Sequence, residues 1–276
     1  MAFLHIPIRS GARAPQRIQG INWASPLARG LVAAWFPVTG SFLGDISRLS
    51  GDHDTGNSIL PTYLSNGLLG VQRPSVGNDD ISAVGAPWDT PSITIAAWVQ
   101  TPTVSAIKAI CTREAAGFGT RIFQFRLNAT GTPQFISNIS AAPTSMDVRT
   151  ATTQVDDGHP HLVVATFEDS VRTAISVDGV VESETSIGGA LAQNSSNPLS
   201  LLFQNRTNFN FWDTGHVGAI LMWNRGFADA EIAALYSPQT RWEIIDQGYR
   251  YISLPAAAGG GGVPIFNHHY RTSRAA

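Results

Sequence analysis

The chain has 276 residues, a net charge of −2 and one cysteine, and 14% of its residues are charged against 43% hydrophobic. This length allows one large β domain or two small ones, with enough apolar residues to fill a core. A single cysteine excludes an internal disulfide framework, so we expect Cys111 to be a small buried residue on a strand. The N-terminal residues lack a secretory-signal pattern, and no apolar run reaches the roughly 18 residues of a membrane span, so we expect no membrane insertion.

The two ends of the chain are basic and its middle is acidic. Residues 1–30 and 247–276 contain arginines and no acidic residue, whereas 31–246 contain all 20 acidic residues. Because unlike charges steer association, the ends are predicted either to dock on an acidic neighbouring surface or to remain solvated tails. The basic residues are too sparse, and too poorly interleaved with aromatic residues, to predict nucleic-acid binding.

Both ends are expected to be arms. Two prolines, Pro7 and Pro15, block a continuous helix, so 1–26 is predicted to be an extended arm. At the other end, 247–276 combines an edge segment, a glycine-rich linker and an apolar tip, a composition typical either of a docking peptide or of disorder. The residues predicted to contact a partner are Arg9, Arg13, Arg17, Arg250, Phe266 and Tyr270.

A buried first strand is expected at 31–36, and a polar turn region follows it. That region contains Asp45, Asp52 and Asp54. Clustered oxygen ligands suit calcium, but the spacing of an EF-hand loop is absent and loop aspartates also cap turns. Calcium is therefore a weak prediction here, and no other cofactor is expected.

Short strands fill most of 93–223. In ITIAAWV (93–99), alternate residues share a face, so Ile93 and Ile95 are expected to point opposite to Thr94. Further strands are predicted at 106–112, 120–127, 133–139, 146–150, 199–203 and 217–223, each closed by Gly, Pro, Asn or Ser.

The stretch 161–181 predicts a β-meander at the centre of an antiparallel sheet. Val163, Ala165 and Phe167 alternate along its first run, which places one set of side chains on a buried face and the other toward solvent. Glu168 to Ser170 suit a turn, and Asp178-Gly179 is the signal for a two-residue type I′ hairpin.

One convincing helix is expected, at 229–236, with Asp229 or Ala228 at its cap and Glu231 at its third position. Many short strands and one late helix predict an all-β fold, a two-sheet antiparallel β-sandwich with extended terminal arms. Residues 27–246 would form this domain.

The order of these pieces resembles the laminin-G-like, concanavalin A-like jelly roll. The resemblance rests on ITIAAWV (93–99), DGHPHLVVATF (157–167), ISVDGV (175–180), GAILMWNR (218–225) and DAEIAALY (229–236), and it covers about 30–240. Pro160 and Ala228 depart from the family pattern, and the calcium-binding aspartates of some members have no clear match.

The flanks NWASPLARGLVAAW (22–35) and YSPQTRW (236–242) look like those of such domains in tailed-phage virion proteins. This resemblance implies a virion structural protein, a capsid decoration or head-fibre subunit that is homo-oligomeric and binds neighbouring capsid or tail proteins through its arms.

Enzymatic chemistry has little support in the sequence. Glycoside hydrolysis needs two carboxylates held close together on one face. The nearest patterns are Glu182-Ser-Glu184, just after a hairpin, and Glu168-Asp169 in a turn. No nucleophile elbow or phosphate-binding loop is present, so we expect a protein that is not an enzyme.

Two functions therefore remain from the sequence. The first is the virion structural role, and the alternative is a carbohydrate-binding adhesin that recognises host-surface glycans by stacking and loop hydrogen bonds. The loop at 205–213 is the candidate for glycan binding, although its aromatic residues also fit core packing. Its candidate residues are Asn205, Arg206, Asn208, Trp212 and Asp213.

Overall fold

A computed structural model describes residues 2–5, 20–37, 42–47, 49, 53–54, 62–65, 69–72, 87–114, 121–139, 146–193, 197–202, 212, 214–246 and 251–254. In the strand segments 2–5, 42–44, 53–54, 62–63 and 251–254 only the backbone is described. No helix within these residues is long and apolar enough to cross a membrane.

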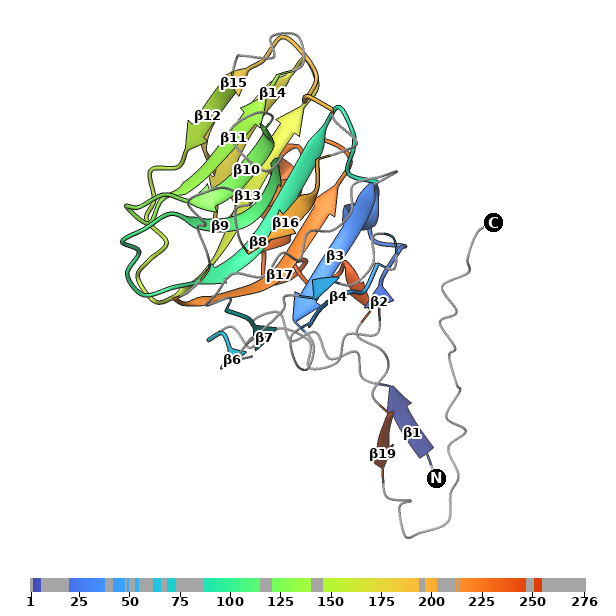
Figure 1. Cartoon of the computed structure of the whole chain (residues 1–276). Coiled ribbons are helices and arrows are strands. Elements are labelled where there is room, and N and C mark those ends of the chain that lie inside the picture. The colour runs from blue at the N-terminus through green and yellow to red at the C-terminus, as the bar shows by residue number, and fades with distance from the viewer. Residues whose placement is uncertain are drawn as a thin grey trace, which may run out of the picture.

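Two antiparallel sheets form a β-sandwich, as predicted (Figure 1). The larger sheet contains β3 (Leu31–Pro37), β4 (Phe42–Asp45), β5 (His53–Asp54), β8 (Ile93–Gln100), β13 (Pro160–Glu168), β14 (Arg172–Val177), β15 (Val180–Ser186) and β17 (His216–Trp223). Its spatial order is β15-β14-β13-β8-β17-β3-β4-β5.

The smaller sheet contains β9 (Lys108–Glu114), β10 (Arg121–Leu127), β11 (Pro133–Asn138), β12 (Met146–Thr150) and β16 (Leu199–Leu201), in the order β12-β11-β10-β9-β16. Short pairs complete the described strands: β1 (Ala2–His5) with β19 (Tyr251–Leu254), β2 (Gly20–Ile21) with β18 (Ile245–Asp246), and β6 (Thr62–Tyr63) with β7 (Leu69–Gly70). The described residues also form a 3-10 helix, η1 (Pro26–Ala28), and an α-helix, α1 (Asp229–Tyr236).

The main core lies between the two sheets and follows the predicted alternation. Ile93, Ile95, Val163 and Phe167 of the larger sheet meet the aromatic residues of the smaller one within a single cluster. Cys111 is fully buried in this cluster on β9, and burial raises the pKa of its thiol. The prediction that Cys111 is a small buried residue on a strand is confirmed.

The opposite face of the larger sheet is also buried, which corrects the expectation that it would meet solvent. Trp98, Leu162 and Val164 point to this face and are at most 3% exposed. The segments that cover it come from both ends of the domain, η1 with its flanks and α1 with residues 242–245. A sheet covered on both faces needs apolar residues at consecutive positions, as in HLVVATF.

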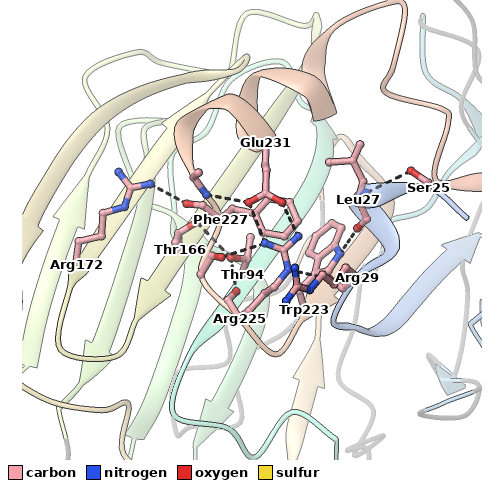
Figure 2. Close-up of polar contacts among 12 residues, drawn as sticks. Ser25, Leu27, Arg29, Thr94, Thr166, Arg172, Trp223, Arg225, Phe227 and Glu231 are labelled. Atoms are coloured by element: carbon pink, nitrogen blue, oxygen red, sulfur yellow. Dashed lines mark hydrogen bonds and ion pairs between the residues drawn. The ribbon is translucent and has the colours of Figure 1, made fainter. Parts of the chain in front are cut away.

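A set of hydrogen bonds fastens this outer cover to the sheet (Figure 2). Trp223 at the end of β17 donates from Nε1 to the carbonyl of Leu27 at 2.7 Å, and Arg225 donates from Nε to the carbonyl of Arg29 at 2.8 Å. The Arg225 guanidinium also donates to both carboxylate oxygens of Glu231 on α1, at 2.9 and 2.6 Å. One arginine thus joins the N-terminal lead-in to the C-terminal helix.

The helix begins after Ala228, one of the two caps predicted. Ala228 has no side-chain acceptor, so only half of a capping box forms, in which Oε2 of Glu231 accepts from the Ala228 N–H at 3.1 Å. The acidic residues Asp229 and Glu231 in the first turn also suit the positive end of the helix dipole.

The predicted hairpin turn is confirmed. Asp178 and Gly179 have φ angles of 50° and 84°, and Val177 pairs with Val180 across the two-residue loop. A Cβ on Gly179 would lie 2.9 Å from Cβ of Tyr236, so both the turn and the approach of α1 require glycine here.

Candidate functional site

The outer face of the smaller sheet carries a set of polar side chains in neighbouring strands. Along β10, Phe123 and Phe125 enter the core, so Gln124 and Arg126 point outward by alternation. The same alternation on β11 sends Phe135 inward and Gln134 outward.

A hydrogen-bonded row crosses three strands on this face. Arg126 lies opposite Gln134, which lies opposite Thr150. Arg126 donates from Nε and Nη2 to Oε1 of Gln134 at 2.9 and 2.6 Å, and Gln134 donates from Nε2 to the Thr150 hydroxyl at 3.0 Å. Since the Thr150 hydroxyl oxygen accepts this bond, the hydroxyl proton of Thr150 can be donated to another acceptor.

The row continues toward the interior on the other side of Arg126. Arg126 donates from Nη1 to Oε1 of Gln124 at 3.1 Å, and Gln124 donates from Nε2 to the Glu114 carboxylate at 2.8 Å. Both Gln124 and Glu114 are buried, at 0% and 2% exposure. The polar row therefore runs from a buried carboxylate to an accessible hydroxyl, with each amide orientation fixed by its neighbours.

An exposed apolar strip lies beside the outer end of this row. Met146 and Val148 are 54% and 42% exposed, and they share with Thr150 the outward face of β12. Val148 lies opposite Ile136 of β11 and Met146 lies opposite Asn138. Exposed apolar side chains that adjoin positioned polar groups are the usual composition of a small-molecule binding surface.

A second arginine lies at the far end of the same face. Nη1 of Arg121 contacts the Met146 sulfur at 3.4 Å, and Nε of Arg121 lies 3.6 Å from the Glu114 carboxylate. Asn138 donates to the Arg121 carbonyl at 3.1 Å, which fixes this corner of the sheet. We call the surface formed by Arg121, Arg126, Gln134, Met146, Val148 and Thr150 the β10–β12 face.

The two ends of the β10–β12 face lie beside Gln134 and Asn138, which are four positions apart on β11, a length of about 13 Å at the usual rise of a strand. The neighbouring half of the same sheet face is closed, because Thr112 and Ser200 are at most 1% exposed. The accessible part thus lies mainly over β12, because Ile136 at the middle of β11 is only 5% exposed whereas Met146 and Val148 are 54% and 42% exposed.

The loop predicted to bind glycans takes a different role where it is described. Trp212 is fully buried in the core between the sheets, the alternative left open by the sequence, so its ring cannot stack on a sugar. Asn205, Arg206, Asn208 and Asp213 lie outside the described residues. The sequence pattern predicts the strands β10, β11 and β12. Their outward residues were not among the predicted site residues, although the alternation in RIFQFRL and MDVRT could have indicated them.

Asp45, one of the three candidate calcium ligands, instead accepts hydrogen bonds that hold a turn together. Its Oδ1 accepts from the Ala34 N–H and from the N–H and hydroxyl of Ser47, and its Oδ2 accepts from the Leu49 N–H. Asp52 lies outside the described residues, and only the backbone of Asp54 is described. Within the described part of the chain, no group of three or more His, Cys, Asp or Glu side chains is arranged to hold a metal ion.

Glu182 and Glu184, the nearest pair of candidate catalytic carboxylates, bind different partners. Glu182 is the extra residue of a bulge in β15, and its Oε2 accepts from the N–H groups of Thr152 and Thr153 at 2.7 and 2.8 Å. Burial raises the pKa of Glu182, but these hydrogen bonds outweigh burial and hold the pKa below its ordinary value. Glu184 binds Arg172 at 2.8 Å instead, so the two groups do not act on one point.

A histidine lies between two carboxylates at the end of β13. Nδ1 of His161 is 2.7 Å from Oδ2 of Asp178 in the hairpin turn, and Nε2 is 3.1 Å from Oδ1 of Asp157. The hydrogen bond to Asp178 raises the pKa of His161 against the opposing effect of burial. The hydrogen bond from the His159 N–H lowers the pKa of Asp157. This cluster fastens the hairpin to the neighbouring loop.

The predicted arm residues Arg9, Arg13, Arg17, Arg250, Phe266 and Tyr270 all lie outside the described residues. The backbone of β1 (Ala2–His5) pairs with that of β19 (Tyr251–Leu254). Within the edge segment expected at the start of 247–276, the described strand β19 therefore pairs with the N-terminal strand β1.

The sheet order and the core define a two-sheet sandwich of the concanavalin A-like kind. Residues 75–233 match the family model Laminin_G_3, described as the concanavalin A-like lectin/glucanases superfamily. This match spans more than half of the chain, so the protein belongs to the Laminin_G_3 family of that superfamily. The resemblance inferred from the sequence motifs is confirmed at this level.

Solved structures with the same fold include two toxin domains. The binding domain of botulinum neurotoxin DC in complex with SialylT has a TM-score of 0.55 and 11% identity, over 76% of this chain and 52% of that chain. A structure on cell entry of botulinum neurotoxin type C, described as dependent on two ganglioside molecules, has a TM-score of 0.54 and 10% identity, over 78% and 52%. The chain therefore spans about half the length of these toxin chains.

A sialidase also shares the fold. The Trypanosoma rangeli sialidase in complex with a difluoro-KDN ligand has a TM-score of 0.51 and 15% identity, over 82% of this chain and 37% of that chain. No curated protein sequence matches the chain. At these identities the structural likeness establishes the fold alone.

Proposed function

We propose that this protein is a non-enzymatic carbohydrate-binding domain that holds an oligosaccharide on the β10–β12 face. The observation that carries the proposal is the pairing of a hydrogen-bonded polar row, Arg126 to Thr150, with the exposed apolar strip of Met146 and Val148. A sugar ring presents hydroxyl groups at its rim and C–H groups on its faces. Fixed donors and acceptors beside an apolar strip match both.

The fold neighbours support a binding role of this kind. Two of them are toxin structures described with SialylT or with gangliosides, and a third is a sialidase with a sugar-acid ligand. Carbohydrate recognition thus recurs among proteins that share this sandwich. Because the identities are low, the argument for this chain rests on its own residues.

The arrangement of carboxylates favours binding over hydrolysis. Among the described residues of this sheet face, Glu114 is the only carboxylate, and it is 2% exposed beneath Gln124. Glycoside hydrolysis needs two carboxyl groups flanking the scissile bond. Incubation of the protein with oligosaccharides should therefore release no shorter sugars.

A matched pair of variants tests the binding surface. Val148→Ser removes apolar area from the strip, whereas Val171→Ser makes the same change at a valine that is 51% exposed away from this sheet. If a ligand covers the exposed 42% of Val148, the lost burial is about 1 kcal/mol, or roughly a fivefold weaker affinity. Val171→Ser should leave the affinity unchanged.

The assay is a glycan array followed by calorimetry with the bound sugars. The absence of any glycan bound by the wild-type protein, or an equal loss in both variants, would refute the proposed face. Hydrolysis of a bound oligosaccharide would refute the non-enzymatic part of the proposal.

The virion role stays a prediction. It rests on the flanking sequences and on arm residues that lie outside the described part of the chain, and it does not exclude glycan binding. Electron microscopy of a native particle with antibody against the protein would test it.

A further inference from the structure

β12 is the last strand at one edge of the smaller sheet (Figure 1), and among the described strands it pairs on one side only, with β11. Its five residues keep a single register with β11. The other end strands of the two sheets are less suited to pairing, because β16 has three residues, β5 has two, and a bulge at Glu182 interrupts β15. The outer edge of β12, the side away from β11, is therefore the most regular strand edge of the described sandwich.

The hydrogen bonds between β11 and β12 show which backbone groups point to this outer edge. The Ala151 N–H donates to the carbonyl of Pro133 at 2.9 Å, so these two residues form a hydrogen-bonded pair. Because such pairs alternate along an antiparallel ladder, Asp147 and Arg149 also bond to β11 through their backbone. The backbone N–H and C=O groups that point to the outer edge are those of Met146, Val148 and Thr150.

The two charged side chains of β12 bind each other on the inward side of the strand. Arg149 donates from Nε and Nη2 to the two carboxylate oxygens of Asp147, at 3.0 and 2.6 Å. The side chains of Arg149 and Asp147 are 25% and 10% exposed, and Val148 lies midway between them in sequence. Inward-pointing charges usually protect an edge strand, because an unrelated strand would leave them unmatched. A strand that pairs here must therefore carry complementary charges.

A second copy of β12, running antiparallel and centred on Val148, is complementary at every position. Val148 would lie opposite Val148 of the second copy, each Asp147 opposite an Arg149, and each Met146 opposite a Thr150. The Val148 pair and the Met146–Thr150 pairs would exchange backbone hydrogen bonds. The Asp147–Arg149 pairs would be of the type whose side chains approach most closely. A contact about a twofold axis requires this kind of self-complementarity.

We propose that the protein forms a dimer in which the outer edges of two β12 strands pair antiparallel about Val148 and join the smaller sheets into one. This inference does not depend on carbohydrate binding. The outward side chains of β12 project from the sheet face rather than from its edge, so the β10–β12 faces of the two copies would adjoin across the twofold axis. Because each copy contributes a strand of five residues, the contact is smaller than the roughly 1,600 Å² of a standard interface, and the dimer exchanges with single chains.

Sedimentation equilibrium of the full chain over a range of concentrations measures this association. The wild-type mass should rise from that of one chain to that of two. Val148→Pro removes an N–H that the β11–β12 ladder does not use, so this variant should fold and remain a single chain at every concentration. Val148→Ser keeps the N–H and should weaken the association less than Val148→Pro does.

A charge swap tests the register of the pairing. Arg149→Asp places a carboxylate opposite Asp147 of the second copy, so the association should weaken at least about tenfold. Asp147→Arg combined with Arg149→Asp restores opposite charges at every position and should restore the dimer. Folding of each variant is checked by its thermal unfolding, and the swap decides the question even if Val148→Pro fails to fold.

The outcomes that overturn this inference are distinct from those that test the proposed function. A wild-type mass of one chain at every concentration, or association that persists unchanged in Arg149→Asp, overturns the β12 dimer. A folded double variant that associates no better than Arg149→Asp also overturns the proposed register. None of these measurements uses a sugar, so carbohydrate binding stands or fails by its own assay.

Discussion

Replacing Gly179 by alanine tests how the hairpin between β14 and β15 is joined to helix α1. Gly179 and Gly158 have nearly equal φ angles of 84° and 83°. A Cβ added at Gly179 would lie 2.9 Å from Cβ of Tyr236, whereas one added at Gly158 would meet nothing within 4 Å. The two substitutions therefore impose similar backbone strain and differ in one contact.

The expected losses follow from these two terms. A positive φ costs alanine about 1–2 kcal/mol, which is the loss in unfolding free energy expected for Gly158→Ala. The close approach to Tyr236 adds the cost of overpacking, about 1–3 kcal/mol, because a Cβ fixed to the backbone cannot rotate away. Gly179→Ala should thus lose about 2–5 kcal/mol.

Urea unfolding followed by tryptophan fluorescence measures both losses. The slope of free energy against urea should be the same in the two variants, because neither changes the surface exposed on unfolding. Equal losses at the two glycines would refute the claim that the hairpin turn packs directly on the helix.

Three further changes probe the other contacts. The wild type should exceed His161→Gln in unfolding free energy by about 1 kcal/mol near pH 5.5, the size of a partly screened ion pair, as measured by urea unfolding. Because the pKa of His161 is raised in the folded state, this stability difference should shrink as the pH rises through the folded-state pKa. Because the pKa of Asp157 is lowered, the contribution of Asp157 to the difference should be lost only as the pH falls below the ordinary aspartate range. A difference that grows toward pH 9 would contradict this. Glu231→Gln should lower the thermal midpoint by several degrees because it weakens the clamp on Arg225, and the exposed Glu243→Gln should leave the midpoint unchanged. Trp212→Ala should cost about 3–5 kcal/mol of stability as a buried-core truncation, and a specific loss of glycan affinity in a fully stable variant would show that its burial is wrong.

The regular alternation of the sequence predicted much of the fold. The strands at β8 and β13, the turn at Asp178-Gly179 and the helix at Asp229–Tyr236 all depend on neighbours a few residues away, and local patterns record such contacts. The burial of the second face of the larger sheet depends instead on residues 21–28 and 242–245, which lie far in sequence from β8 and β13, the strands that they help to cover. The apolar run from Leu162 to Val164 carried a signal of this cover, since a half-exposed strand would have alternated.

The candidate face could not be located from the sequence in the same way. Arg126, Gln134 and Thr150 become neighbours only through the pairing register of three strands, and a shift of one residue would turn each side chain to the other face. The loop at 205–213 was a candidate because exposed aromatic side chains bind sugars, but Trp212 is buried in the core. Composition cannot distinguish an aromatic ring that fills a core from one that meets solvent.

The central claim, that the β10–β12 face holds the ligand, is tested most directly by a crystal structure of the protein with the oligosaccharide that binds most tightly. We expect a sugar lying over Val148, with one of its oxygens within hydrogen-bonding distance of the Thr150 hydroxyl. A sugar bound at another surface of the sandwich, with the β10–β12 face empty, would contradict it.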